Sequence, residues 1–447
     1  MTSEKIRLGV IGANISVGWA HRSHLPALLA SPEFELTAVC TTKRESSEES
    51  AAKFGARMAF HDHNEMLASP EIDAVAVVVR VPNHYDLTRD VLNAGKHVYT
   101  EWPLGATLDE AKELAELARS KGLQAMVGLQ ARAAPAMLYM KELVESGYVG
   151  EVMSCHVSLI RGGVLERTSG RTWQRDDSLG ATTLTIACGH TIDALRFVVG
   201  DFSDVSTVVS TQAPQWYETD TQRMVDVTAP DNILVSGKLD NGGVASVHVA
   251  VVPMSDSGLR MEIYGREGTL VADSDDSPQL GDVRLRGAKT GDAGLQDLEI
   301  PSRHVYVLEG MPKGAPYNVG QMYYQFGQAI KSGTPCEPNF DTAVELHRFL
   351  DAIRESSDQG RQAAVHSAKS QFEYAILWFD KLTRNGKKTV RPELVEGPGL
   401  LLSKFSDRHL VPIDCHWRLR RFRLLIVRCR VVVLSRKWVI TGRMTSA

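Results

Sequence analysis

Apolar runs alternate with helical patterns along the first third of the chain. Residues 6–12, 34–40 and 72–79 are mostly apolar, and each run is followed by a segment with helical spacing. Runs of this kind are typical of strands that are buried on both faces of a parallel sheet. Residues 4–128 are therefore predicted to form a doubly wound α/β domain, with the sheet between two layers of helices.

The segment TLDEAKELAELARSKG carries signals for both ends of a helix. Thr107 is a candidate N-cap, and Glu110 follows it three residues later, which is the spacing of a capping box. Gly122 supplies the left-handed position at which helices commonly end. The predicted helix connects two further apolar runs, 97–101 and 123–129, in one more β-α-β unit.

After residue 150 the pattern changes to short, closely spaced strands separated by turn signals. Such spacing predicts a large open antiparallel sheet. Residues 129–370 are therefore predicted to form an α+β domain for substrate binding and oligomerisation. An uncovered apolar sheet face is costly, so a homodimer or homotetramer that pairs through this sheet is expected. Helices are predicted at 190–199, 319–332 and 341–357.

Residues 379–447 show neither a helical nor a strand period. After Asp380 there are sixteen Lys and Arg against four Asp and Glu, so the net charge of −4 combines an acidic body with a basic tail. The segment KLTRNGKKTVRPELVEG also resembles the peptide encoded by repetitive elements between bacterial genes. A disordered or adventitious tail is the preferred interpretation, and a basic arm for nucleic acid or anionic lipid is the alternative.

Composition and charge exclude several classes of function. The acidic body gives no electrostatic reason to expect nucleic acid, so a small molecule is the expected partner. The six cysteines are scattered without a CxxC pair, which indicates neither a disulfide framework nor a metal site and suits reduced thiols in a cytoplasm. No signal peptide or membrane span is predicted, because the N-terminus lacks an apolar core and charges interrupt residues 422–440.

The turn after the first apolar run, GANISVG, lies where doubly wound folds bind the pyrophosphate of a dinucleotide. Asn14 stands where the second glycine of a GxGxxG motif would be, and the loop is lengthened. Because asparagine tolerates a positive φ better than other residues except glycine, the turn is expected to survive, with the side chain crowding the phosphates. The candidate cofactor-binding residues are Gly12, Ala13, Asn14, Ile15 and Gly18.

The second predicted strand ends without the carboxylate that would bind the ribose 2′-hydroxyl of NAD. Two hydroxyls and two cations follow it instead, and this set suits a 2′-phosphate, so NADP is preferred over NAD. A solvated loop is the alternative, because Lys and Arg are common on any surface. The residues concerned are Thr41, Thr42, Lys43 and Arg44.

Motifs at the carboxyl edge of the predicted sheet carry a family resemblance. The chain contains, in order, GVIGA, HLPAL, VPNHYD, AGKHVYTEWPL, VGLQAR, GYVGEV and GHTIDAL. In this order they resemble the Gfo/Idh/MocA family of NAD(P)-dependent oxidoreductases, and within it the Gal80-like branch, over roughly residues 5–367. The resemblance implies a Rossmann-like first domain and further cofactor contacts at Pro82, Asn83, His84, Glu101, Trp102, Pro103 and Gln130.

Two positions depart from the motifs with which this family transfers protons. Glu101 and Pro103 match the Glu-Lys-Pro motif, but Trp102 replaces its lysine, and Ile186 stands where an aspartate precedes the matching His190. Loss of an acid–base group costs roughly 10²- to 10⁴-fold in rate. His190 is therefore the predicted acid–base group, with Glu101 as a second catalytic candidate. Trp102 is predicted to form an apolar wall beside the nicotinamide or a sugar, the alternative being a core residue.

Three functions follow from the resemblance. The first is an NAD(P)-dependent oxidoreductase that acts on a sugar, polyol or sugar-derived substrate. The second is a Gal80-like transcriptional regulator or sensor that binds the cofactor without turnover. The third is a redox-neutral glycosidase or lyase that uses NAD transiently. The first is preferred, because the loop and the sheet edge retain the means to hold a dinucleotide.

Overall fold

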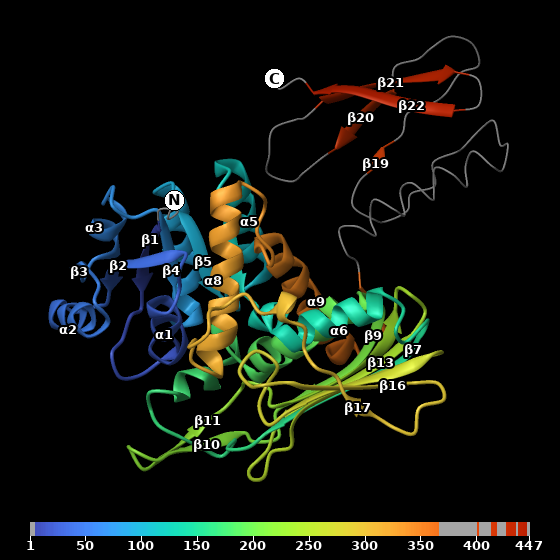
Figure 1. Ribbon diagram of the computed structural model, residues 1–447, viewed down its shortest axis with the longest axis horizontal. Coiled ribbons are helices and arrows are strands. Elements are labelled where there is room, and N and C mark those ends of the chain that lie inside the picture. The colour runs from blue at the N-terminus through green and yellow to red at the C-terminus, as the bar shows by residue number, and fades with distance from the viewer. Residues whose placement is uncertain (1–4, 366–399, 402–412, 418–425, 435–436, 445–447) are drawn as a thin grey trace. The chain divides into compact units, whose positions relative to one another are not determined.

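The computed structural model describes residues 5–365 and four strand segments, 400–401, 413–417, 426–434 and 437–444. The chain divides into two compact units, Met1–Ser367 and Ala368–Ala447. Both main sheets lie in the first unit, which runs from blue to orange in Figure 1. Within it, the boundaries expected for the two domains stay predictions.

A six-stranded parallel sheet occupies the N-terminal part of the first unit, with the strand order β3-β2-β1-β4-β5-β6. The order reverses between β1 and β4, and ligands of such folds bind at the carboxyl ends of the strands beside this point. This sheet confirms the predicted Rossmann-like fold. The strands are β1 (Ile6–Ile11), β2 (Phe34–Cys40), β3 (Met58–Phe60), β4 (Ala74–Val77), β5 (His97–Glu101) and β6 (Ala125–Gly128).

Helices pack against both faces of this sheet through two separate cores. On one face, a core that includes Leu8, Val10 and Phe34 receives the helices η1 (Ala20–His24), α1 (Leu25–Leu29), α2 (Arg44–Phe54) and α8 (Ala315–Ser332). The other face is covered by α3 (His63–Leu67), α4 (His84–Asn93), α5 (Leu108–Lys121) and α9 (Phe340–Gln359). Two helices from the C-terminal part of the unit thus complete the first domain.

Helix α5 shows why the local sequence defines its ends. The Thr107 side chain accepts the Glu110 N–H, and Gly122 ends the helix in the left-handed region with φ +64°. The Glu110 carboxylate accepts the N–H of Ala106 at 2.7 Å rather than that of Thr107. The predicted capping box is therefore half formed, because the chain before the helix presents a neighbouring amide to the carboxylate.

A nine-stranded sheet forms the rest of the unit, in the order β17-β16-β15-β14-β7-β13-β12-β9-β18. All neighbouring strands are antiparallel except β7 and β13, which pair in parallel. The predicted large open sheet is confirmed with this one difference. The strands are β7 (Val152–Arg161), β9 (Phe202–Ser210), β12 (Asn232–Leu239), β13 (Val244–Val251), β14 (Gly258–Gly265), β15 (Gly268–Ser274), β16 (Arg284–Lys289), β17 (Gln296–Asp297) and β18 (Ala363–Ala364).

Shorter elements connect the two sheets. They include a small sheet in the order β11-β10-β8, which was not predicted from the sequence. The predicted helix 190–199 is α7 (Gly189–Val199), and a π-helical turn, η6 (Thr183–Cys188), runs directly into it. The remaining elements are η2 (Val81–Asn83), η3 (Gln130–Ala133), α6 (Pro135–Glu145), β8 (Glu166–Arg167), η4 (Thr172–Arg175), η5 (Asp177–Leu179), β10 (Gln215–Glu218), β11 (Arg223–Asp226) and η7 (Ser302–His304).

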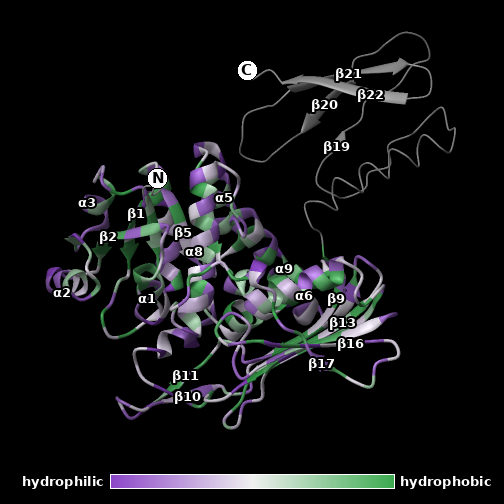
Figure 2. Cartoon of the chain, in the orientation of Figure 1, coloured by the Kyte–Doolittle hydropathy of each residue, from purple (hydrophilic) through white to green (hydrophobic). Residues whose placement is uncertain are grey.

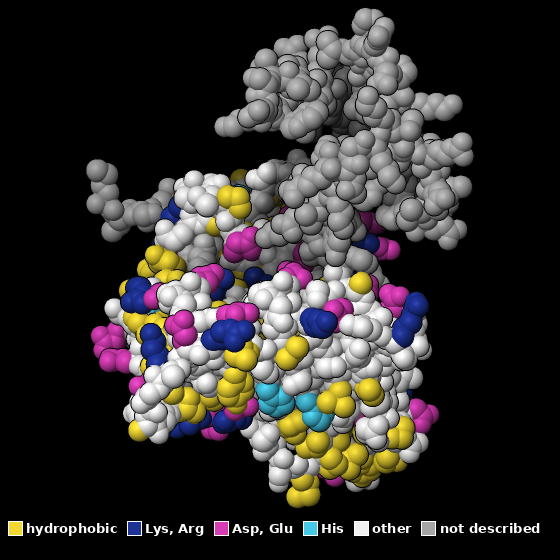
Figure 3. All heavy atoms as spheres, turned by 90° about the vertical axis from the view of Figure 1, so that its right-hand side faces the viewer, with side chains coloured by type: hydrophobic (Ala, Val, Ile, Leu, Met, Phe, Trp, Pro, Cys, Tyr) yellow, Lys and Arg dark blue, Asp and Glu magenta, His cyan; other side chains and the backbone are white. Residues whose placement is uncertain are grey.

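The large sheet has one covered and one open face. In β12, which η6 contacts, Ile233 and Val235 are buried in the main core, while Leu234 between them is 46% exposed. Figure 2 shows the apolar strands of both sheets in green, and Figure 3 shows hydrophobic side chains gathered with histidines on the face it presents. The exposed apolar residues on these strands include Met153, Val208, Leu234, Val244 and Tyr264.

The second unit contains four antiparallel strands, β19 (Leu400–Leu401), β20 (Ile413–Trp417), β21 (Ile426–Leu434) and β22 (Lys437–Met444). No strand was predicted in this segment from its residue pattern. Most of residues 379–447 lie outside the described part of the chain, so the expected disorder or adventitious origin of this segment stays a prediction. Among the described residues, no helix has the length and apolar character needed to cross a membrane.

Candidate functional site

Gly12 holds the turn after β1 in a conformation that requires glycine. Its φ is +92°, and a Cβ at this position would lie 2.1 Å from the carbonyl oxygen of Val78, just after β4. Its N–H donates to the carbonyl of Cys40 at 2.9 Å. Gly18 ends the loop with φ +95° and open space around it, while Ala13 is buried. Gly12 is therefore required by the close approach of this turn to the end of β4. The open space at Gly18 is what a phosphate approaching the backbone of the loop needs.

The side chain of Asn14 folds back over this turn. Its Oδ1 accepts hydrogen bonds from the N–H groups of Ser16 at 2.9 Å and Val17 at 3.0 Å, and from the Ser16 hydroxyl at 3.2 Å. Positive φ values fall on Gly12 and Gly18 but not on Asn14, so the expectation that Asn14 supplies a left-handed position is wrong. Its carboxamide instead engages two amides that a bound pyrophosphate could use.

The end of β2 places its cations at the start of α2. The Thr41 hydroxyl lies 2.6 Å from the Ser46 hydroxyl and donates to the Lys43 carbonyl at 3.0 Å, so it organises the turn. Lys53 in α2 donates to the carbonyl of Ile15 at 2.7 Å, which ties this helix to the glycine loop. The residues that remain exposed at this corner are Thr42, Lys43, Arg44 and Glu45.

Glu101, the last residue of β5, is the centre of a buried hydrogen-bond network. Its carboxylate lies 2.7 Å from His24 Nε2 and accepts the Gln130 amide at 2.9 Å. The other ring nitrogen of His24 lies 2.7 Å from the Tyr323 hydroxyl, in α8. Burial raises the pKa of Glu101, but the bonds from His24 and Gln130 outweigh it and hold this pKa below its ordinary value. Glu101 is thus an ionised anchor that joins the Rossmann sheet to α8.

The network gives a structural role to two residues that were predicted to bind the cofactor, one of which was also a catalytic candidate. Glu101 and Gln130 bind one another in the interior, and both are buried. Because the Glu101 carboxylate is already bonded to His24 and Gln130, it is not free to accept a proton from a substrate. His24 and Tyr323, which complete the network, were missed because no local pattern in the sequence connects residues 299 positions apart.

His84 fixes the two loops at the carboxyl edge. Its Nδ1 lies 2.6 Å from the Pro103 carbonyl and its Nε2 lies 3.1 Å from the Val79 carbonyl. Burial lowers the pKa of His84, although both backbone contacts act to raise it. His84 therefore joins the motifs VPNHYD and TEWP, while Pro82 and Asn83 are exposed beside it.

The Trp102 indole lies in the core between the two sheets. The residue is 4% exposed, its Nε1 donates to the Thr185 carbonyl at 2.7 Å, and its ring centroid lies 4.6 Å from that of His347 in α9. A Cβ on Gly189 would lie 2.8 Å from the indole nitrogen, so only glycine allows this approach. The packing favours the alternative, a core residue, over the wall beside a ligand.

His190 follows Gly189 directly and is buried. Its Nδ1 has no hydrogen-bond partner among the described residues, and burial lowers its pKa to about 4. The charges of Glu101 and Asp193 act to raise this pKa, whereas that of Arg161 lowers it. The imidazole is therefore neutral at pH 7 and retains the capacity for a hydrogen bond. Asp193, one turn on, is paired with Arg132 at 2.7 Å and is structural.

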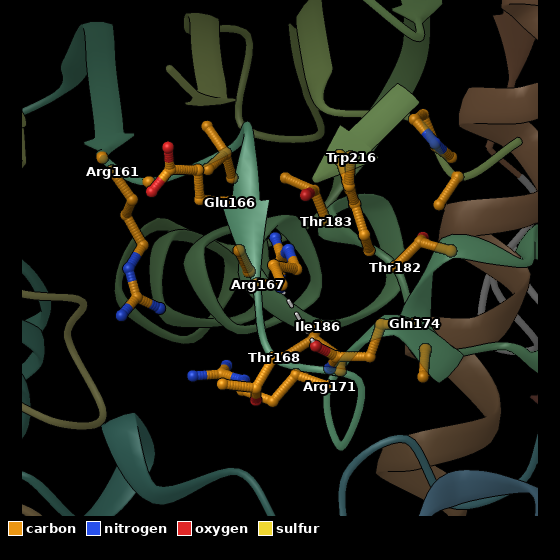
Figure 4. Close-up of a pocket in the computed structure, with 17 residues that line it drawn as sticks. Arg161, Glu166, Arg167, Thr168, Arg171, Gln174, Thr182, Thr183, Ile186 and Trp216 are labelled. Carbon is orange, nitrogen blue, oxygen red and sulfur yellow. Dashed lines mark hydrogen bonds between the residues drawn. The ribbon is translucent and has the colours of Figure 1, made fainter. Parts of the chain in front are cut away.

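A cavity of about 400 Å³ opens beside η6. Ile186 and Ala187 line this cavity. His190 follows shortly after them in the chain, at the start of α7. Figure 4 shows the side chains around this cavity, with the hydrogen bond from Arg167 to Gln174 dashed. The sequence motifs pointed to this segment through His190, but they did not reveal the lining that β8, η4 and β10 contribute. No cluster of three or more His, Cys, Asp or Glu suited to a metal occurs in the described part of the chain.

The structure brings the predicted residues together only in part. The glycine turn lies at the carboxyl end of β1, while Glu101 is the last residue of β5 and Trp102 follows it directly. His190 reaches the same region from the second domain, because Trp102 packs against the backbone of Thr185 and Gly189. The exposed residues after β2 lie next to the glycine turn, because the Gly12 N–H donates to the carbonyl of Cys40, the last residue of β2.

Comparisons with known proteins agree on both parts of the first unit. A family model described as an oxidoreductase family with an NAD-binding Rossmann fold matches residues 6–129, and one for the Gal80p C-terminal domain matches residues 135–274. The dehydrogenase aclE of Aspergillus oryzae is 30% identical over 374 residues, which cover 80% of this chain and 98% of that protein.

Two further similarities concern a regulator and a solved structure. The galactose/lactose metabolism regulatory protein GAL80 of Saccharomyces cerevisiae is 28% identical over 398 residues, 83% of each chain. The structure of a levoglucosan dehydrogenase in complex with NADH and levoglucosan superposes with a TM-score of 0.71 at 23% identity, covering 81% of this chain and 100% of that one. This structural likeness shows a shared fold.

The position of the indole makes a prediction about stability. Trp102→Ala should lower the free energy of unfolding by about 3–5 kcal/mol, because a large buried side chain is removed from a packed seam. Trp102→Phe should cost less, since it keeps an aromatic ring and loses the bond to Thr185. Urea unfolding measures both, with Trp173→Ala as a half-buried control. A Trp102→Ala protein as stable as the parent would contradict the packed position.

Proposed function

The chain belongs to the Gfo/Idh/MocA oxidoreductase family, and from this premise we propose that it is an NAD(P)-dependent oxidoreductase acting on a sugar, polyol or sugar-derived substrate. The dinucleotide would lie at the carboxyl edge of the first sheet, with its pyrophosphate on the turn at Gly12 and Gly18. Family membership supports this, as do the open space at Gly18 and the amides of Ser16 and Val17, which donate to the Asn14 side chain on this loop.

The observation that carries the proposal is the state of His190 beside the cavity. The imidazole is neutral, its Nδ1 has no bond within the described structure, and Ile186 and Ala187 of the adjoining turn line the cavity. A bound nicotinamide supplies the hydride acceptor, and His190 Nδ1 would take the hydroxyl proton of the substrate. A base with a pKa of about 4 is weak at pH 7, so slow turnover is expected from a chain that lacks the lysine.

NADP is the proposed cofactor in preference to NAD. The support is the exposed corner after β2, where Thr42, Lys43 and Arg44 carry one hydroxyl and two cations before the first carboxylate, that of Glu45. An arrangement of this kind suits a 2′-phosphate, because guanidinium and ammonium groups bind phosphate through charge-assisted hydrogen bonds. The levoglucosan dehydrogenase structure holds NADH, so the choice between the two cofactors is open to a direct test.

A regulator or sensor without turnover is the second candidate. Its support is the similarity to GAL80 over 83% of each chain, together with the loss of the lysine at Trp102. Such a protein would bind the dinucleotide and leave it unchanged.

The exposed apolar side chains on the open sheet face support the further proposal that this face pairs with a second copy, as a homodimer or homotetramer.

The role of His190 is tested by His190→Ala in the full chain. Turnover should fall about 10²- to 10⁴-fold while the NADPH dissociation constant stays within twofold, because His190 handles a proton and does not hold the cofactor. Fluorescence titration and a turnover screen over sugars and their oxidised forms measure the two quantities, with His156→Ala as an exposed control.

The same enzyme assay gives a pH dependence. Since the neutral imidazole accepts the proton and its pKa is about 4, the rate of substrate oxidation should stay level between pH 6 and 8 and fall only under more acidic conditions.

Unchanged turnover in His190→Ala would rule out His190 as this base. Saturable NADPH binding with no turnover in the parent would favour the sensor, and product formed without net cofactor change would favour redox-neutral chemistry.

Asn14→Ala tests whether the loop binds the pyrophosphate. Removing the carboxamide frees the amides of Ser16 and Val17, so the cofactor should bind about threefold to tenfold more tightly, as expected for about one hydrogen bond. Ser16→Ala is the control, because it leaves Asn14 on both amides. Weaker binding in Asn14→Ala would mean that the asparagine itself holds the cofactor.

Replacing both Lys43 and Arg44 by Ala tests the cofactor preference. The NADPH dissociation constant should rise about tenfold or more, because two charge-assisted contacts to the 2′-phosphate are lost. The NADH dissociation constant should stay nearly unchanged. Lys121→Ala, an exposed cation at the end of α5, serves as the control. Tighter binding of NADH than NADPH by the parent protein would overturn the preference.

A further inference from the structure

The cavity beside η6 collects positive charge. Arg161 ends β7, Arg167 ends β8, and Arg171 precedes η4, and all three line the cavity. Among the residues that line it, Glu166 is the single carboxylate. Figure 4 shows these side chains around one cavity, contributed by strands and turns that are adjacent along the chain. A sugar with only hydroxyl groups has no need of such a cluster.

These arginines have little counter-charge. Arg161 contacts Asp276 at 3.4 Å, but no Asp or Glu lies within 4.0 Å of the Arg167 or Arg171 guanidinium in the part of the chain that the structure describes. Arg167 donates to the Gln174 amide oxygen at 3.3 Å, and its Nε has no partner among the described residues. The cluster therefore keeps unused capacity to donate hydrogen bonds.

Arg167 is also held in a fixed position. Its guanidinium stacks on the Trp216 ring at 4.0 Å from the centroid, while Gln174 binds it from the side. Burial, together with the charges of Arg171 and Arg161, lowers its pKa to about 10. The group remains charged at pH 7 despite this repulsion. A bound anion would offset the repulsion, and a preorganised guanidinium binds one with little loss of side-chain entropy.

The cluster adjoins the proposed acid–base group. Ile186 and Ala187 belong to both the cavity lining and the turn that leads into His190, and the charge of Arg161 acts on the His190 imidazole. The threonines of this cavity supply hydroxyl groups that suit a polyol chain. These are Thr168, Thr182 and Thr183. One ligand could thus meet the arginines at one end and His190 at the other.

We propose that the substrate carries an anionic group, a carboxylate or a phosphate, which Arg161, Arg167 and Arg171 bind in this cavity. The substrate class is then a sugar acid or a sugar phosphate rather than a neutral sugar. This inference rests on the proposed oxidoreductase function, because it names the substrate of the same site. Planar guanidinium groups match both anions through paired N–H donors.

Calorimetric titration of the full chain tests the inference without requiring turnover. The probes are D-gluconate, D-glucose 6-phosphate and neutral D-glucose, each with and without saturating NADPH. At least one of the two anions should bind tenfold or more tightly than glucose, and whichever binds more tightly identifies carboxylate or phosphate as the group. A higher salt concentration should weaken binding of the anion and leave the affinity for glucose unchanged.

The variant Arg171→Gln should lose most of this anion preference, about tenfold, with an unchanged NADPH dissociation constant. Arg175→Gln is the matched control, since Arg175 belongs to the adjoining turn, donates to the Asp226 carbonyl at 3.1 Å and does not line the cavity. The variant Arg167→Lys keeps the charge and loses the planar guanidinium group. It should weaken anion binding less than Arg171→Gln does.

Three outcomes would overturn the inference. These are equal binding of glucose and both anions, an unaltered anion preference in Arg171→Gln, and a loss of NADPH affinity in Arg171→Gln that leaves anion binding intact. The last would assign the arginines to the phosphates of the cofactor. Anion binding that depends on Arg171 in a protein with no cofactor binding would support the anionic ligand and reject the proposed redox function.

Discussion

The hydrogen bond from Trp102 Nε1 to the Thr185 carbonyl, and the indole packing around it, set the geometry of the whole site. The indole fills the seam between the parallel sheet and the turn η6, with His347 of α9 on one side and Gly189 on the other. Because α7 begins at Gly189, this packing also fixes where His190 stands. The group that replaces a titrating lysine thus positions the residue that we propose as the proton acceptor.

Buried charge ties the same region to the rest of the fold. Glu101 is held by His24 and Gln130, and His24 in turn contacts Tyr323 of α8, so a helix from late in the chain is fastened to the edge of the first sheet. Carboxylates without donors are costly inside proteins, and the network satisfies this one. With Glu101 held in this network, the proposed function assigns proton transfer to His190 and binding of the substrate's charge to the arginine cluster.

The sequence predicted the elements far better than the directions of side chains. Period and capping signals located the ends of α5 and all the parallel strands except the short β3, because these depend on local residues such as Thr107 and Gly122. The indole of Trp102, the carboxamide of Asn14 and the cavity beyond Arg167 depend on contacts between distant segments. Asn14 illustrates the limit: its residue type allows a left-handed turn, but Gly12 and Gly18 already provide one. The parallel pairing of β7 and β13 likewise follows from long-range topology.

A crystal structure of the full chain grown with excess NADPH tests the central claim most directly. The account predicts a dinucleotide at the carboxyl edge of the first sheet, with its pyrophosphate against the turn at Gly12 in place of the Asn14 carboxamide and its nicotinamide facing His190. A crevice closed by its own side chains, or a nucleotide bound elsewhere, would contradict the redox function and the substrate class inferred from it.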